Sequence, residues 1–190
     1  MNLDEEFANM RQALKQGVKV VAVNQLFTTP PELAARMVEM ADINEDSKVL
    51  EPSAGTGIIA RAIVETGAEV VAVEINSDLS IHLGTIVNHV INTDFLEYEY
   101  PCEFDAVVMN PPFENGADIK HILHARKFLK PGGRLVAICA DGPRQSERLK
   151  GLADTWERLP AGTFKHAGTM VNTVLLTMAG MRKLLKPSRI

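Results

Sequence analysis

The chain has 190 residues, of which 46% are apolar and 23% charged. This is about the length of one domain, and the composition is too apolar for intrinsic disorder. The net charge of −4 hides an uneven distribution, because residues 1–113 carry 6 Lys and Arg against 18 Asp and Glu, whereas residues 114–190 carry 14 against 6. No apolar run reaches the roughly 18 residues of a membrane span, and Cys102 and Cys139 are too far apart for a zinc ribbon. We therefore expect a cytoplasmic protein without a membrane partner.

The apolar pattern predicts a single domain over residues 1–190 with a helical extension within 1–25. A further helix is expected from Pro30 and Pro31 to about Met40. From residue 47 onward, β-branched runs alternate with helical stretches, which is typical of a doubly wound α/β fold whose mostly parallel sheet is buried on both faces. The predicted strands are 48–50, 69–73, 89–91, 104–109 and 134–140, and the predicted helices are 58–65, 77–87 and 117–129. An antiparallel pair, with one strand near Thr163 and one over 171–178, is expected to end the sheet.

The first chemical signal is EPSAGTG at residues 51–57, between a predicted strand and a predicted helix. Its glycines allow a tight turn and a close approach of a ligand, and the helix start offers unpaired N–H groups. Glu74, at the end of the next strand, can accept hydrogen bonds from both hydroxyls of a ribose. Since the carboxyl ends of parallel strands meet at one edge of a sheet, the pattern predicts a nucleoside-containing cofactor there.

Acidic residues favour S-adenosylmethionine as this cofactor, although AGTGIIA also fits the dinucleotide pattern GxGxxA. The carboxylate of Glu51, followed by Pro52, suits a cationic methionine amino group and would repel a pyrophosphate. Asp94 offers an acceptor to an adenine amino group beside the apolar Phe95 and Leu96. Alternatively, Asp94 only caps the turn that follows it.

The second chemical signal is Asn110-Pro111-Pro112-Phe113, directly after a predicted strand. Prolines fix φ and donate no hydrogen bond, so the local carbonyl groups are held in place. An amino group on a planar ring could donate to the Asn110 side chain and to the Pro111 carbonyl, while Phe113 stacks on that ring. Such hydrogen bonds favour a nitrogen lone pair directed at a sulfonium methyl, which predicts methyl transfer by positioning, without a metal. Taken alone, the motif could also be a strand-ending turn.

Five motifs in order across residues 27–113 resemble those of Rossmann-like amino-methyltransferases, in particular adenine-specific DNA methyltransferases. They lie at residues 27–38, 51–57, 73–76, 94–96 and 110–113. The resemblance implies a sheet of about seven strands in the order 3-2-1-4-5-7-6, with the seventh strand antiparallel and helices on both faces. It also makes Asn110 to Phe113 the catalytic residues. The cofactor-binding residues that it implies are Phe27, Thr28, Thr29, Pro30, Glu51, Pro52, Ser53, Ala54, Gly55, Gly57, Glu74, Ile75, Asp94, Phe95 and Asn110.

The resemblance implies methylation of an exocyclic amino group, with adenine in DNA favoured; an RNA base and a protein glutamine amide are alternatives. The basic second part of the chain favours nucleic acid as the partner. Its nearest candidate surface has Arg144, Arg148 and Lys150, assisted by Arg126, Lys127, Lys130 and Lys165. Only 77 residues, 114–190, follow the catalytic motif, so a partner or a second copy is expected to help in target recognition. Two alternatives lie outside the methyltransferases: an NAD(P)-dependent oxidoreductase and a non-catalytic binding module.

Overall fold

The computed structural model describes residues 27–99, 101 and 103–180. The predicted extension within 1–25 and the basic residues after 180 lie outside this part. The strands of the sheet are β1 (Lys48–Pro52), β2 (Glu69–Glu74), β3 (His89–Asn92), β4 (Phe104–Met109), β5 (Leu129–Ala140), β6 (Thr155–Arg158) and β7 (Thr173–Ala179). The α-helices are α2 (Pro31–Ala41), α3 (Ile58–Val64), α4 (Ser77–Leu83), α5 (Ala117–Ala125) and α6 (Pro143–Leu149). Short 3-10 helices lie at η2 (Phe95–Glu97), η3 (Glu114–Gly116), η4 (Arg126–Phe128), η5 (Lys150–Leu152) and η6 (Lys165–Ala167).

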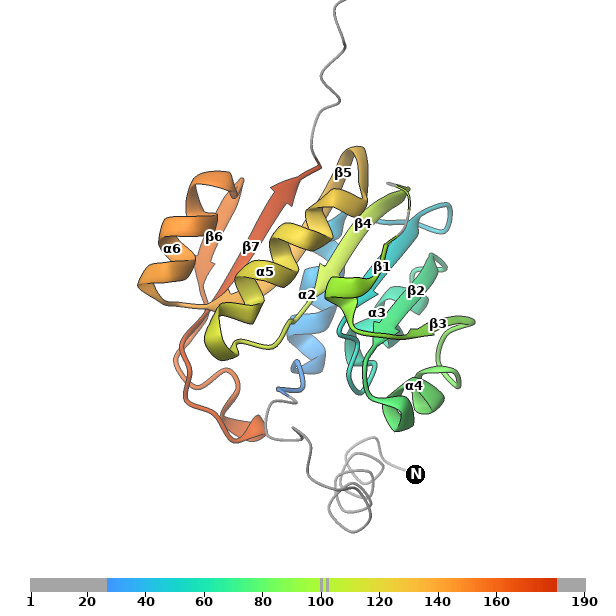
Figure 1. Ribbon diagram of the computed structural model, residues 1–190, viewed down its shortest axis with the longest axis horizontal. Helices are drawn as coiled ribbons and strands as arrows, with labels where there is room; N and C mark the ends of the chain where they lie inside the picture. Colours follow the sequence, from blue (N-terminus) through green and yellow to red (C-terminus); the bar gives the residue numbers. More distant parts are fainter. Residues whose placement is uncertain (1–26, 100, 102, 181–190) are drawn as a thin grey trace, which may run out of the picture.

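The strands form one sheet in the order β3-β2-β1-β4-β5-β7-β6 (Figure 1). β1 to β5 pair in parallel, whereas β7 is antiparallel to both β5 and β6. The predicted fold class, strand order and antiparallel seventh strand are therefore confirmed.

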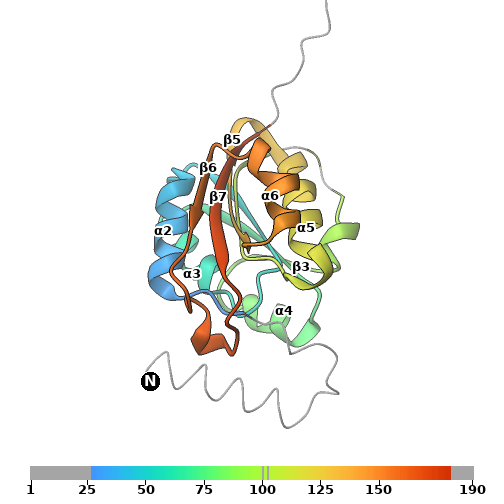
Figure 2. The same ribbon diagram turned by 90° about the vertical axis from the view of Figure 1, so that its left-hand side faces the viewer.

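Helices cover both faces of the sheet, with α2 and α3 on one side and α5 and α6 on the other (Figure 2). Successive strand residues point to opposite faces, and both faces are apolar: Val49 and Val108 join the core under α2 and α3, while Leu50 and Val107 join the core under α5. Burial on both faces explains why the central strands are continuous apolar runs.

The prediction of a strand near Thr163 is wrong, because the partner of β7 is β6. Three of the four residues of β6 are exposed and Trp156 is half-buried. The strand lies at the edge of the sheet, so it lacks the apolar run that marks the central strands. Pro160 and Gly162 place the predicted segment in a turn instead. Arg36 of α2 holds the edge strand through two hydrogen bonds to the Glu157 carboxylate, of 2.9 and 2.6 Å.

Two of the predicted helices end several residues earlier than expected: α4 ends at Leu83, and α5 gives way at Ala125 to the 3-10 helix η4. In the described ranges, no helix combines the length and the apolar composition that crossing a bilayer requires.

Candidate functional site

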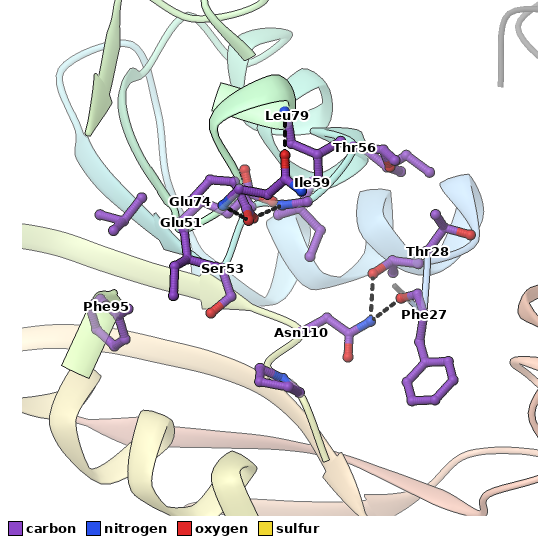
Figure 3. Close-up of a pocket in the computed structure, with 18 of the residues that line it drawn as sticks. Phe27, Thr28, Glu51, Ser53, Thr56, Ile59, Glu74, Leu79, Phe95 and Asn110 are labelled. Atoms are coloured by element: carbon purple, nitrogen blue, oxygen red, sulfur yellow. Dashed lines mark hydrogen bonds between the residues drawn. The ribbon is translucent and has the colours of Figure 1, made fainter. Parts of the chain in front are cut away.

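A cavity of about 360 Å³ opens at the carboxyl edge of β1, β2 and β4 (Figure 3). Most of the predicted cofactor-binding residues line it: Phe27, Thr28, Thr29, Glu51, Ser53, Ala54, Gly55, Glu74, Ile75, Asp94, Phe95 and Asn110. Three predicted residues are not among the lining residues, namely Pro30 before α2, Pro52 at the end of β1 and Gly57 at the start of α3. The structure thus brings the separate motifs of the sequence together around one cavity.

The glycine loop is tied to the acidic end of the neighbouring strand. Gly55, at a φ of 56° that favours glycine, donates its N–H to Glu74 Oε2 at 2.8 Å. The N–H of Asn76 donates to the other oxygen, Oε1, also at 2.8 Å. Each carboxylate oxygen can accept a second hydrogen bond, so Glu74 is both oriented by the backbone and able to accept from ribose hydroxyls.

Glu51 is a buried acid that forms no ion pair with any cation in the described part of the chain. The residue is 2% exposed, and Oε2 has no hydrogen-bond partner among the described residues. Burial raises the pKa of Glu51 well above its ordinary value, and the nearby Glu74 carboxylate raises it further. A cationic amino group entering the cavity would therefore be stabilised by Glu51, which is what the methionine end of S-adenosylmethionine offers.

The end of the cavity that is predicted to hold the adenine lies at η2. Asp94 accepts the N–H of Leu96 through Oδ1 at 2.9 Å and so caps η2, and it also lines the cavity. The two interpretations of Asp94 are therefore compatible. Phe95 is buried beside it, whereas Ile75 is 67% exposed at the mouth. Both apolar side chains can contact a flat ring.

Asn110 joins the cofactor cavity to the proposed target position. Its Nδ2 group donates to the Phe27 carbonyl at 2.8 Å and to Thr29 Oγ1 at 3.1 Å, as Figure 3 shows. Because a carbonyl only accepts, the amide nitrogen must face Phe27 and the amide oxygen must face away. Within residues 27–99, 101 and 103–180, this Oδ1 atom has no hydrogen-bond partner. The side chain is thus fixed with an unused acceptor.

The other three residues of the predicted catalytic motif differ in whether they line the cavity. Pro112 lines the cavity, whereas Pro111 is buried. Phe113 is 8% exposed and does not line the cavity: its ring stacks on Phe27, with centroids 5.5 Å apart, and meets the edge of Phe164 at 6.3 Å. Stacking of Phe113 on a target ring stays a prediction, and it requires this aromatic contact to rearrange.

A histidine from a distant segment holds the other side of the Phe27–Thr29 turn. His166 Nε2 donates to the Thr28 carbonyl at 2.9 Å, and its ring stacks near Phe164. The segment before β7 therefore fixes the same turn that orients Asn110.

The predicted basic residues do not form one surface. Lys130 is paired with Asp105 at 2.7 Å, and Arg126 donates to the Ala179 carbonyl at 2.9 Å. Both are near the start of β5, whereas Arg144 follows its end. The pairing of β5 with β4 is irregular between Leu129 and Arg134, and the regular part that follows, Arg134–Ala140, spans about 20 Å at about 3.3 Å per residue.

Sequence reasoning missed several lining residues: Thr56, Ile58, Ile59, Val73, Asn76, Leu79 and His121. Most are direct neighbours of the predicted motifs and could have been included for that reason. His121 had no such signal, because the phase of α5 brings it to the cavity.

Comparisons with known proteins identify the family of this chain. A family model described as the methyltransferase small domain matches residues 32–162. A proposed ribosomal RNA small subunit methyltransferase A of Methanopyrus kandleri is 32% identical over 51% of this chain and 37% of its own length. The type II methyltransferase M.HincII of Haemophilus influenzae is 24% identical over 70% of this chain and 31% of its own length. The chain thus spans about a third of the length of these relatives.

A solved structure of a candidate RNA methyltransferase from Pyrococcus horikoshii shares the fold. Its TM-score is 0.66 at 20% identity, and the match covers 97% of this chain and 100% of that one. S-adenosylmethionine is the cofactor of the matched family, as predicted, and the cavity residues fit it. The chain belongs to the methyltransferase small domain family.

Proposed function

We propose that this protein transfers a methyl group from S-adenosylmethionine to the exocyclic amino group of an adenine in nucleic acid. The observation that carries the proposal is the orientation of Asn110, whose amide nitrogen is occupied by Phe27 and Thr29 while Oδ1 has no partner among the described residues. Oδ1 is itself buried, so this fixed acceptor would serve an incoming NH2 group once the target opens the wall around it.

Separate residues of the chain would bind the cofactor and position the target amine. Glu51 would hold the amino group of the methionine end, Glu74 the ribose hydroxyls and Asp94 the adenine amino group. When bound, the cofactor supplies an electrophilic methyl group on a sulfonium. Asn110 Oδ1 would accept one N–H of the target amine, which restrains the amine and favours a lone pair directed at the methyl group. Positioning of this kind can contribute about 7 to 11 kcal/mol.

DNA and RNA are supported equally as the source of the adenine. The relatives include proteins named for ribosomal RNA and a type II methyltransferase, so the preference for DNA derived from the resemblance is not kept. A glutamine amide is less favoured, because the described part of the basic segment places Arg144, Arg148 and Lys165 on exposed positions suited to phosphates.

The test uses deuterated methyl donor with single-stranded and duplex DNA and RNA, followed by digestion to nucleosides and mass spectrometry. We expect labelled N6-methyladenosine or its deoxy form from the wild-type protein. Asn110→Ala should lower turnover by about 100-fold, comparable to losing one positioned polar group in other active sites, with nearly unchanged affinity for S-adenosylhomocysteine. Asn88→Ala, an exposed asparagine just before β3, is the matched control. Labelled protein with unlabelled nucleic acid would overturn the proposal.

A further inference from the structure

The adenine end of the cavity contains a histidine that no motif assigns. His121 lies on α5, is 7% exposed and lines the cavity together with Asp94 and Phe95. Its ring centroid is 5.8 Å from that of Phe95. The imidazole is therefore part of the cavity wall on the side where the adenine is expected.

One nitrogen of this imidazole is committed to the helix backbone. Nδ1 lies 2.8 Å from the Ala117 carbonyl oxygen, which only accepts, so Nδ1 carries the proton. In a neutral imidazole the other nitrogen is then an acceptor. In the part of the chain that the structure describes, Nε2 has no hydrogen-bond partner. An acceptor nitrogen without a partner among the described residues thus belongs to a mostly buried side chain of the cavity wall.

The surroundings favour the neutral form of His121. Burial lowers its pKa, and His124 on the same helix lowers it further. The Ala117 carbonyl and the carboxylates of Asp94 and Asp118 act in the opposite direction, but the net shift is downward. The acceptor nitrogen is therefore the state expected near neutral pH.

We propose that His121 Nε2 is a second acceptor for the adenine amino group of the cofactor. Asp94 uses Oδ1 to cap η2, which leaves Oδ2 for one N–H of the amino group, and His121 would take the other. This inference rests on the cofactor orientation in the proposed function. A 6-oxopurine would place an oxygen against two acceptors, and a neutral His121 could not donate from Nε2 without giving up its bond to Ala117. The pair therefore selects a 6-aminopurine over a 6-oxopurine.

Calorimetric titration with S-adenosylhomocysteine and S-inosylhomocysteine tests this selection without any turnover. The wild-type protein should bind the adenosyl compound more tightly, and His121→Leu should reduce the ratio of the two affinities by about tenfold, the equivalent of one hydrogen bond of about 1.4 kcal/mol. His124→Leu is the matched control. His124 lies on the same helix and also contacts Phe95, but it bonds to the Tyr98 carbonyl and does not line the cavity. An unchanged ratio in His121→Leu, or the same reduction in His124→Leu, would overturn the proposal.

A second measurement needs no variant. In protein labelled with ¹⁵N-histidine, His121 should show a protonated Nδ1 and an unprotonated Nε2, and the Nε2 resonance should move when S-adenosylhomocysteine is added. A protonated Nε2, or an unmoved resonance at saturation, contradicts the inference. If the cofactor product binds as described but no nucleic acid is methylated, the proposed function fails while His121 keeps its role. Absence of binding by the wild-type protein overturns both.

Discussion

Replacing Glu51 by Gln should strengthen the ligand-free fold and weaken cofactor binding. The wild-type carboxylate is 2% exposed, and the pKa of Glu51 lies well above the ordinary value of 4.5 because of burial and the Glu74 carboxylate. Since the folded-state pKa is raised, the favourable contribution of Glu51 to folding is complete below about pH 4.5. It is lost as the pH rises through the folded-state pKa. Each unit of elevation corresponds to about 1.4 kcal/mol.

Glutamine has nearly the same shape and no charge, so the variant escapes this loss. The melting temperature of Glu51→Gln should exceed that of the wild type at about pH 8, and the two should approach each other near about pH 5. Each kcal/mol of difference in the free energy of unfolding corresponds to roughly 2 to 4 °C in a chain of this size. The same variant loses a charged hydrogen bond to the ligand amino group, about 1.5 to 3 kcal/mol, or about 10- to 150-fold in Kd.

Thermal unfolding across pH, with calorimetric titration of S-adenosylhomocysteine, measures both effects. Glu65→Gln, on an exposed residue that follows α3, controls for the loss of one carboxylate. Parallel pH profiles for wild type and Glu51→Gln, or an unchanged affinity, would refute the reasoning that Glu51 is a buried charge kept for a cationic ligand.

Two further predictions concern stability. Asp118 is fully buried and accepts hydrogen bonds from the backbone N–H groups of Ile119 and Ala140 and from the Gln145 side-chain amide. Asp118→Ala leaves these donors unpaired and should lower the free energy of unfolding, measured in urea, by about 3 to 5 kcal/mol. A loss below about 1 kcal/mol would contradict this prediction. Gly57 and Gly132 both have positive φ, but an added Cβ at Gly57 would lie 2.6 Å from Ile86 Cδ1, whereas at Gly132 no described atom lies within 4 Å. The free energy of unfolding of Gly57→Ala should therefore be about 1 to 3 kcal/mol lower than that of Gly132→Ala. Equal free energies in the two variants would show that the positive φ, and not the contact with Ile86, causes the loss of stability.

The central sheet could be predicted because burial on both faces leaves a strong signal. β4, for example, is apolar at five of its six positions, and those five are fully buried. β6 carries no such signal, since an edge strand pairs on one side only and Trp156 is only partly buried. Composition therefore marks strands most clearly where both faces of the sheet are covered.

Residues at the carboxyl edge could be predicted from their place after each strand, because parallel strands bring those positions together. Side-chain direction was less accessible. The Phe113 ring was expected to face a target, yet it packs between Phe27 and Phe164, residues that are distant in the sequence. Likewise, the presence of His121 in the cavity wall depends on which face of α5 turns toward the cavity.

The position of β7 between β5 and β6 has a consequence for biosynthesis. β7 is the last strand along the described chain, yet it fills an interior position of the sheet. A nascent chain that has emerged only to residue 172 exposes the unpaired edge of β5 and leaves β6 without a neighbour. Such an edge is a template for pairing between chains. The described sheet is therefore complete only once β7 has paired, and until then the edge of β5 is open to pairing with another chain.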